Sequence, residues 1–335
     1  MSNKKIKTFQ KLRTTINKSI RNKNKFIILL ILIMLFLGIV FKPENFQNQN
    51  QNPHEKKWED SLKKKKYFIT LAAIFKNEND YLEEWLDFYV KQGIDQFYMF
   101  DNNDDAGHDK ITNKIFDKYK DKITHIIWNN VKTEGGNTVQ RKAYQYCYDR
   151  YNHEFQWMML ADIDEFGYSI EPNKNLKDIV MEYANPNTPY IKVPRFNFGN
   201  SGHKEKPEGG VIKNFTRREK NISSYKSISN VDFVDKRFRS MGVHRLLYTT
   251  DKNMINKGIK IACSLPESYN KIPLIMNHYY TKSYQEYVNK CMMWNQKPIN
   301  YLGKRTSDCY NKKEFDEKNI NTVEDLRAKN LVYNS

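Results

Sequence analysis

Cysteine is scarce in this sequence, with only four among 335 residues, at positions 147, 263, 291 and 309. None of them forms a Cys-x-x-Cys pair, which argues against a cysteine-based zinc site. Cys147 lies in a helical pattern and is predicted to be a buried thiol. A disulfide among the other three stays open if the domain lies in an oxidising compartment.

Sequence signatures of several common classes are also absent. There is no glycine-rich phosphate-binding loop, no arrangement typical of a Ser/His/Asp hydrolase, and no internal repeat. The formal net charge of +17 does not indicate nucleic-acid binding, because residues 1–66 contain 16 Lys/Arg and 4 Asp/Glu, whereas residues 67–335 contain 40 and 35. The basicity therefore belongs mainly to the N-terminal region, and no nucleic-acid partner is expected.

Residues 26–41 form a run without any polar side chain, close to the roughly 17–25 residues of a membrane helix. The preceding residues 1–25 contain nine Lys/Arg and no acid, and no small-x-small cleavage site follows the run. A buried core helix and a cleaved signal peptide are the alternatives. We expect an uncleaved signal-anchor with a cytosolic tail over residues 1–25, which is type II topology. Residues 42–66 are predicted to be a polar stalk.

The catalytic part of the chain is then expected over residues 67–335, in a lumenal compartment such as the Golgi or endoplasmic reticulum. The bias towards Lys, Asn and Ile is typical of an AT-rich genome, so a viral or protist source stays open. In a virus the membrane would be that of the virion or of its host.

Apolar runs alternate with helical patterns in the first half of this domain. Strands are predicted at 67–75, 96–100, 123–128 and 157–161. Helices are predicted from an Asp80/Glu83 capping box to Gly93, near 109–120, and over 137–151. This alternation predicts an α/β domain with a mainly parallel, doubly wound sheet. The second half is strand-poor and irregular, with a strand-like alternation over 190–198 and a helical pattern from Tyr284.

Polar clusters follow three of the predicted strands, at residues 76–80, 101–105 and 162–165. The carboxyl ends of parallel strands meet at one edge of a sheet, where ligands of open α/β folds bind. Each cluster alone is explained by a solvated turn or a helix cap. Three on one edge are better explained as a site. Asp162 and Asp164 form an Asp-x-Asp pattern, whose carboxylates would hold Mg²⁺ or Mn²⁺.

Together these segments resemble glycosyltransferase family 92 and related family-2-like enzymes. The matching residues, in chain order, are Lys76-Asn77-Glu78, Tyr81-Leu82-Glu83-Glu84-Trp85, Phe100-Asp101-Asn102, Gln140-Arg141-Lys142-Ala143-Tyr144, Asp162-Ile163-Asp164-Glu165-Phe166, Phe198-Gly199-Asn200-Ser201-Gly202-His203, Thr216-Arg217-Arg218, Lys226-Ser227-Ile228, and His278-Tyr279 with Lys282-Ser283. The resemblance implies a GT-A-type fold, a doubly wound mixed sheet that here follows a single transmembrane helix. It also implies a UDP-sugar donor, with galactose as the default sugar, a divalent cation and inversion at the anomeric carbon.

The resemblance assigns the cation to Asp164, supported by Asp162 and by His278, with His244 as the substitute for His278. A carboxylate and a neutral imidazole together suit Mn²⁺, with Mg²⁺ as the alternative. Glu165 is expected to support these ligands or to cap a helix. A lone histidine is as often a structural residue, so that alternative stays open for His278.

Nucleotide binding is expected at Asn77, Glu78, Asp101, Arg141 and Asp162. Asp101 would accept a hydrogen bond from the base or ribose, and its alternative is a turn residue. Arg141 would approach the diphosphate, and its alternative is a solvated helix face.

Arg217 and Arg218 would hold phosphate oxygens, or simply end a surface strand. The candidates for the base that deprotonates the acceptor hydroxyl are Glu205, Glu208 and Asp232. One departure from the family pattern is Lys213, where related sequences often carry an acid.

The predicted function is a metal-dependent inverting glycosyltransferase that moves a hexose from a UDP-sugar to a glycan acceptor. The expected partners are these two substrates and the membrane, and a homodimer stays open. Two alternatives remain, a membrane-tethered glycan-binding protein without turnover and a nucleotidyl- or phosphotransferase that uses the same acids.

Overall fold

A computed structural model describes residues 58–131, 138–234, 272–295 and 312–333 of the chain. The predicted cytosolic tail, the anchor over 26–41 and most of the predicted stalk lie outside these residues. Within the described ranges, none of the helices has the length and apolar character needed to cross a bilayer.

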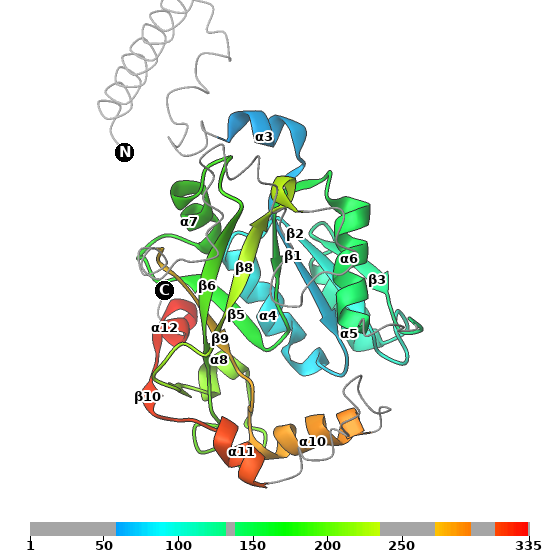
Figure 1. Ribbon diagram of the computed structural model, residues 1–335. Helices are drawn as coiled ribbons and strands as arrows, with labels where there is room; N and C mark the ends of the chain where they lie inside the picture. Colours follow the sequence, from blue (N-terminus) through cyan, green and yellow to red (C-terminus); the bar gives the residue numbers. More distant parts are fainter. Residues whose placement is uncertain (1–57, 132–137, 235–271, 296–311, 334–335) are drawn as a thin grey trace, which may run out of the picture. The chain divides into compact units, whose positions relative to one another are not determined.

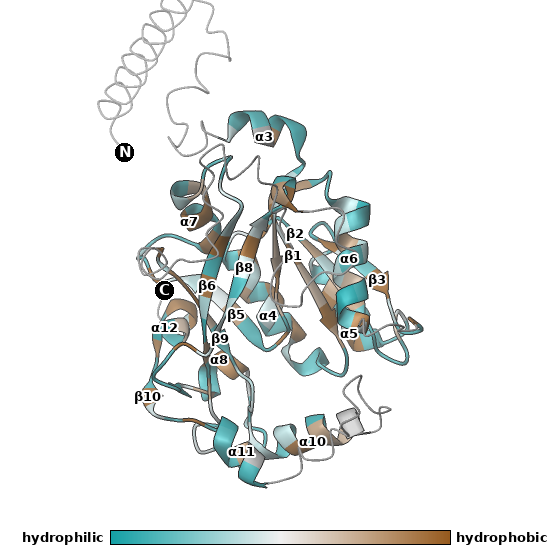
Figure 2. Cartoon of the chain, in the orientation of Figure 1, coloured by the Kyte–Doolittle hydropathy of each residue, from teal (hydrophilic) through white to brown (hydrophobic). Residues whose placement is uncertain are grey.

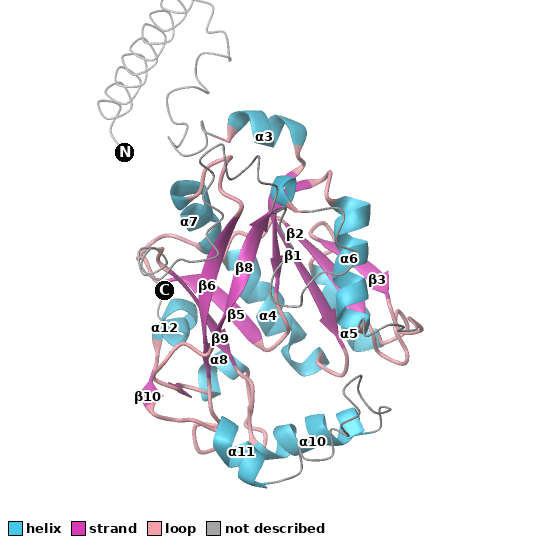
Figure 3. Cartoon of the chain, in the orientation of Figure 1, coloured by secondary structure: helices cyan, strands magenta, loops and turns pink. Residues whose placement is uncertain are grey.

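The domain is a mixed α/β fold built on one curled eight-stranded sheet (Figures 1 and 3). The strands are β1 (Tyr67–Phe75), β2 (Gln96–Asp101), β3 (Ile123–Ile127), β4 (Phe155–Leu160), β5 (Glu165–Ser169), β6 (Tyr190–Asn197), β8 (Ser224–Asn230) and β9 (Leu274–His278). Their order is β3-β2-β1-β4-β8-β6-β9-β5. The first four are parallel, β8 is antiparallel to both β4 and β6, β9 is parallel to β6, and β5 is antiparallel to β9.

Helices and a small ribbon complete the described part. The helices are α3 (Glu59–Lys64), α4 (Asn79–Lys91), α5 (Lys110–Lys118), α6 (Val139–Tyr151), α7 (Leu176–Tyr183), α8 (Val211–Asn214), α10 (Tyr284–Asn295), α11 (Lys312–Lys318) and α12 (Arg327–Tyr333), with a short 3₁₀ turn η2 (Val231–Phe233). The ribbon pairs β7 (Arg217–Arg218) with β10 (Val323–Glu324). The architecture is compatible with the GT-A-type fold that the sequence led us to expect.

In the parallel half of the sheet, β1, β2 and β4 are buried on both faces, which explains their apolar runs, whereas the edge strand β3 is half-buried. One face packs on α4, α5 and α7, and the other face packs on α6. Along β1, for example, Leu71 and Ala73 belong to the first core and Ala72 belongs to the second. Figure 2 shows apolar residues concentrated in the strands. The doubly wound arrangement predicted for this half is confirmed.

Two local expectations are corrected. The Asp80/Glu83 capping box is wrong, because α4 begins at Asn79 and its N-cap, Glu78, makes no side-chain capping hydrogen bond. Asp80 pairs instead with Lys206 across to a later loop. The alternation over 190–198 does form a strand, β6, but the second half is not strand-poor, since β5, β8 and β9 also join the sheet. The sheet as a whole is mixed, as the resemblance implied, and not mainly parallel, as the alternation alone predicted.

The folded domain also begins earlier than residue 67, inside the segment predicted to be a stalk. Trp58 is fully buried, with its ring centroid 5.2 Å from that of Phe68 and 5.9 Å from that of Trp157. Its Nε1 donates a hydrogen bond of 3.2 Å to the carbonyl of Met181. One large aromatic residue thus attaches the start of α3 to the core, although the helix itself is mostly exposed.

Trp58→Phe should lower the free energy of unfolding by about 1–3 kcal/mol, because the Met181 carbonyl loses its donor while most of the apolar burial remains. Urea unfolding of the full chain, followed by the circular dichroism of the backbone so that the signal does not depend on tryptophan, measures this change. Glu59→Ala, at an exposed residue of α3, serves as the control, and its effect should stay within about 0.5 kcal/mol. Equal effects of the two substitutions would contradict the placement of Trp58 in the core.

Candidate functional site

The three predicted polar clusters follow β1, β2 and β4 at their carboxyl ends. These strands are adjacent and parallel, so the clusters share one edge of the sheet, as the sequence predicted. Asp162 and Asp164 lie in the short connection between β4 and β5, and Glu165 is the first residue of β5. Trp85 of α4 fixes this connection, because its Nε1 lies 3.0 Å from the carbonyl oxygen of Asp162 and 3.1 Å from that of Glu165.

Asp162 is held by α6 and β8. Its Oδ1 accepts hydrogen bonds from Gln140 Nε2 at 2.6 Å and from the Tyr144 hydroxyl at 3.4 Å. Its Oδ2 lies 3.5 Å from Lys226 Nζ. Burial raises the pKa of Asp162 by more than the charge of Lys226 lowers it. Both carboxylate oxygens therefore already have partners from the chain.

Asp164 is nearly fully buried, and its two oxygens differ. Oδ2 accepts a hydrogen bond from Lys290 Nζ of α10 at 3.0 Å, whereas Oδ1 accepts none from the described residues. Burial alone would raise the pKa of Asp164, but Lys290 and His278 hold it well below its ordinary value. Asp164 is therefore a carboxylate with one oxygen left unsatisfied.

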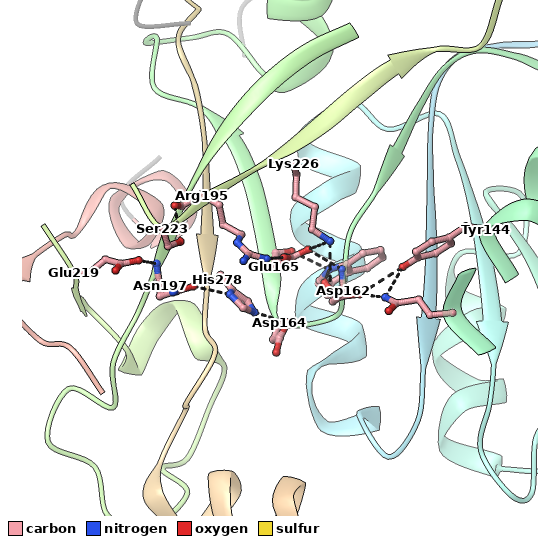
Figure 4. A network of polar contacts seen from close by, with 12 residues as sticks. Tyr144, Asp162, Asp164, Glu165, Arg195, Asn197, Glu219, Ser223, Lys226 and His278 are labelled. Carbon is pink, nitrogen blue, oxygen red and sulfur yellow. Dashed lines mark hydrogen bonds and ion pairs between the residues drawn. The ribbon is translucent and has the colours of Figure 1, made fainter. Parts of the chain in front are cut away.

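His278, the last residue of β9, faces that oxygen. Its Nε2 lies 3.5 Å from Asp164 Oδ1, and its Nδ1 lies 2.8 Å from Oδ1 of Asn197 (Figure 4). Because an amide oxygen only accepts, Nδ1 carries the hydrogen. Burial lowers the pKa of His278 to about 3, which keeps the ring neutral. Nε2 therefore turns a lone pair towards a carboxylate oxygen that accepts no hydrogen bond from the described residues.

Glu165 is the centre of a buried ionic network. Its Oε1 lies 2.7 Å from Arg195 Nη1, and its Oε2 lies 2.7 Å from Lys226 Nζ. Oε2 also accepts a hydrogen bond of 3.1 Å from the backbone nitrogen of Asp162. The β4–β8 register pairs Met159 with Ile228, and this brings Lys226 beside the acids. Glu165 therefore stabilises the β4–β5 connection that contains Asp162 and Asp164.

No group of three or more His, Cys, Asp or Glu residues in the described ranges is arranged around a common point as metal ligands. Asp164 and His278 are brought together, whereas Asp162 is directed towards Tyr144 and Lys226 (Figure 4). The substitute ligand His244 lies outside the described residues.

Asn77 and Glu78 lie directly beyond β1. Asn77 adopts a left-handed backbone conformation with φ of 57°, and its backbone nitrogen donates to Asn103 Oδ1 at 2.7 Å. Burial raises the pKa of Glu78 to about 7; Lys282 opposes this rise and the charge of Asp164 adds to it. Glu78 therefore interacts electrostatically with the acidic residues at this edge of the sheet, which is called the acid edge below.

Asp101 is fully buried, and the chain itself satisfies both of its oxygens. Oδ1 accepts from the backbone nitrogen of Asn103 at 3.1 Å and from its Nδ2 at 2.8 Å. Oδ2 accepts from the Gly107 nitrogen at 3.1 Å and lies 3.0 Å from His125 Nε2. Asp101 organises the loop after β2, which is the turn role that the sequence left open as the alternative.

The three arginines have different surroundings. Arg141 lies in the first turn of α6, and its Nε has no hydrogen-bond partner among the described residues. Arg217 Nε donates to the Asn321 carbonyl at 3.0 Å. Arg218 Nε donates to Asp325 at 2.6 Å, and its guanidinium lies 4.2 Å from the ring centroid of Phe196. Arg217 and Arg218 therefore hold the C-terminal segment.

The Arg218–Asp325 pair predicts acid sensitivity. Burial alone would raise the pKa of Asp325, but hydrogen bonds from Arg327 and Arg218 lower it from 3.8 to about 2. Because the folded-state pKa is the lower one, this stabilisation is complete above about pH 4 and is lost as the pH falls through about 2. Asp325→Asn should remove about 2 kcal/mol at pH 7 and flatten this part of the unfolding profile, whereas Asp316→Asn, at an exposed residue of α11, should not. Parallel profiles for Asp325→Asn and the unaltered chain would contradict the prediction.

The three candidates for the base are spread out. Asp232 accepts from Gln156 Nε2 at 2.9 Å, which places it at the amino end of β4, at the opposite end from the acids. Glu205 is exposed in the loop that bonds to the start of α10 through Lys204. The structure does not bring Asp232 to the acid edge.

Glu208 lines a pocket of about 880 Å³ beside Glu84 and Asp87 of α4 and Tyr333 of α12. This pocket lies against the outer face of α4, whereas Trp85 on the inner face contacts the acid connection. Glu208 is therefore separated from the acids by α4.

Sequence reasoning missed four residues that the structure joins to the acids, namely Arg195, Asn197, Lys226 and Lys290. Lys226 was noted only as part of a family motif, and Lys290 only as part of a helix. One usable signal was present. Arg195 and Lys226 are charged residues within strand-like segments of the domain, and a buried charge in a strand requires a partner.

The cysteines agree with the sequence reasoning as far as they are described. Cys147 is a free, buried thiol. Cys291 is disulfide-bonded, and the other two cysteines lie outside the described residues.

Comparison with known proteins identifies the family. The sequence model of "Glycosyltransferase family 92" matches residues 65–331. A family 92 protein of Oryza sativa subsp. japonica is 25% identical over 171 residues, which cover 51% of this chain and 28% of the relative. A protein of Ricinus communis is 24% identical over 233 residues (67% and 37%), and one of Arabidopsis thaliana is 27% identical over 184 residues (50% and 31%). The chain thus spans about a third of the length of these relatives. Because the family model covers most of the chain, this protein belongs to glycosyltransferase family 92.

Proposed function

We propose that the protein is a metal-dependent inverting glycosyltransferase that moves a hexose from a UDP-sugar to a glycan acceptor, with UDP-galactose as the first donor to test. Family membership supports the reaction class, and the acid edge of the sheet supports the location of the site. The proposal includes an anchor at residues 26–41 that holds the domain at a membrane.

The observation that carries the proposal is the pairing of Asp164 with His278. Oδ1 of Asp164 has no hydrogen-bond donor among the residues that the structure describes, and it faces an unprotonated Nε2 of His278 at 3.5 Å. Two lone pairs repel each other in a buried site unless a cation lies within reach of both. Carboxylate oxygen and imidazole nitrogen are ligands that Mn²⁺ accepts, so these residues fit the expected metal. Asp162 could become a further ligand of the cation only if its carboxylate gave up the hydrogen bonds from Gln140 and Tyr144.

When bound, a divalent cation would neutralise the negative charge of the departing diphosphate. The acceptor hydroxyl oxygen forms a bond to the anomeric carbon while the bond from that carbon to the diphosphate oxygen breaks. UDP leaves with the bonding electrons, and the hydroxyl proton passes to a carboxylate of the chain. A single displacement of this kind inverts the anomeric carbon. Glu205 stays the predicted candidate for this carboxylate, because Asp232 lies at the opposite end of β4 and Glu208 is separated from the acids by α4.

The test uses the purified full chain with a panel of UDP- and GDP-sugars. Nucleotide release is followed with Mn²⁺ and with a chelator. Release of UDP from one sugar, abolished by the chelator, would support the proposal and name the donor. Release of a nucleoside monophosphate or of pyrophosphate would favour a nucleotidyl- or phosphotransferase. Retained glycan binding without any release would favour a glycan-binding protein.

Asn197 offers a test of the cation site that does not depend on turnover. It fixes the tautomer of His278, and loss of such a partner typically weakens metal affinity 10–100-fold. Asn197→Leu should therefore weaken Mn²⁺ binding by roughly 10–100-fold, as measured by electron paramagnetic resonance of free Mn²⁺. Asn197→Asp keeps an acceptor at Nδ1 and should bind at least as tightly as the unaltered chain. Equal Mn²⁺ affinity of the leucine variant would contradict this role.

A further inference from the structure

We propose that Lys290 binds the diphosphate of the donor, beside the cation held by Asp164 and His278. This inference rests on the proposed function and assigns a role to a residue that sequence reasoning did not single out.

Lys290 lies at the acid edge, and it is open to solvent where Asp164 is not. Its Nζ is 3.0 Å from Asp164 Oδ2, on the oxygen that does not face His278. The side chain of Lys290 is 29% exposed, whereas that of Asp164 is 3% exposed. The Lys290 side chain is therefore accessible to a soluble anion, whereas Asp164 is shielded from solvent.

Hydrogen bonds at the start of α10 fix the orientation of this helix, which the contact between Lys290 and Asp164 requires. Ser283 and Glu286 bond reciprocally, with the Ser283 nitrogen donating to Glu286 Oε2 at 3.1 Å and the Glu286 nitrogen donating to Ser283 Oγ at 3.3 Å, which is a capping box. Glu286 also accepts from the Tyr81 hydroxyl of α4. The helix start is thereby tied to the strand–helix unit that follows β1, and Lys290 lies two turns further along the same helix.

Positive charge accumulates around Lys290. Lys290 and Lys318 lie 5.5 and 5.4 Å from the ring centroid of Tyr280, and Lys282 lies 4.1 Å from that of Tyr81. Asp164 and Glu78 are carboxylates whose charges interact with Lys282 and Lys290. Even with both ionised, they balance only two of these positive charges, so a divalent cation on the Oδ1 side leaves an excess of positive charge. A diphosphate has the charge and the several oxygens to satisfy both groups.

This arrangement predicts two effects of opposite sign in one variant. Lys290→Met removes a positive charge next to the cation, so Mn²⁺ alone should bind about tenfold more tightly or better. UDP in the presence of saturating Mn²⁺ should bind about 10–100-fold more weakly, because a charge-assisted hydrogen bond to phosphate is lost. Free Mn²⁺ is measured by electron paramagnetic resonance and UDP binding by calorimetry, both on the full chain.

Lys290→Arg keeps the charge and the donors, and its two affinities should stay within about threefold of those of the unaltered chain. If the methionine variant does not fold, Lys290→Gln, which keeps the length and a neutral donor, takes its place.

Weaker or unchanged Mn²⁺ binding in Lys290→Met would overturn the inference, since Lys290 would then merely orient Asp164. Unchanged UDP binding would overturn it as well. A failure of the unaltered chain to bind UDP in a Mn²⁺-dependent manner would instead overturn the proposed function, so the two failures are distinguishable.

Discussion

Asp164→Asn is expected to lower the rate constant for nucleotide release at least about a hundredfold, because a bound cation contributes several kcal/mol to charge stabilisation and each 1.4 kcal/mol is a factor of ten. The amide keeps the size of the side chain but removes the negative charge that faces His278. Lys290 would also lose its counter-ion at Oδ2. The measurement is kcat/KM for the donor identified in the sugar panel, over a range of Mn²⁺ concentrations.

A matched control lies on the same edge of the sheet. Asp104 follows β2, pairs with Lys76 and has a side chain that is 91% exposed. Asp104→Asn should change kcat/KM by less than about twofold, since screened surface pairs contribute little. Undiminished activity of Asp164→Asn, or an equal loss in both variants, would remove Asp164 from the centre of the proposed site.

Lys226→Met is expected to lower the free energy of unfolding by about 3–5 kcal/mol, because the side chains of Lys226 and Glu165 are both fully buried and the substitution leaves Oε2 of Glu165 without its ammonium partner. Arg195 lies on the other oxygen of Glu165 and compensates only in part. Urea unfolding of the full chain measures the change. Lys118→Met serves as the control, because Lys118 forms exposed pairs on the surface, and its effect should stay below about 1 kcal/mol.

The double variant Glu165→Gln/Lys226→Met separates charge from packing. It removes the buried carboxylate charge together with that of Lys226, although Arg195 then loses its partner, and it should recover part of the lost stability, so the two substitutions should not be additive. Additive losses would show that Lys226 acts by packing alone. The same cycle tests whether the acid connection depends on this network, since Glu165 also binds the backbone of Asp162.

The sequence predicted the parallel half of the sheet because the relevant signals are local. Strand β1 has the bounds that its apolar run indicated, and β2, β3, β4 and α6 differ from expectation by only a few residues. Burial on both faces makes such strands continuous apolar runs, which a short window of sequence reveals. The gathering of polar clusters at one edge followed from the parallel direction alone.

The antiparallel half and most of the site could not be predicted in the same way. Strand β5 begins with Glu165, a charged residue that looks unsuited to a buried strand until Arg195 and Lys226 are placed beside it. Strand β9 becomes recognisable only through its pairing with β5 and β6. The partners of Asp164 likewise come from distant positions, and no local pattern connects Asp164 to Lys290, 126 residues later.

The long sequence distance between Asp164 and its partners affects the order in which the protein folds. The register that pairs Glu165 with His278 closes a loop of more than a hundred residues. Closing such a loop costs chain entropy before its contacts stabilise the structure, so contacts of this range form late in folding. During synthesis β9 and α10 emerge more than a hundred residues after the acids that follow β4. We expect the parallel half to reach its native state first, and the ability to bind Mn²⁺ to arise only in the last folding step, so that Mn²⁺ affinity reports on completed folding.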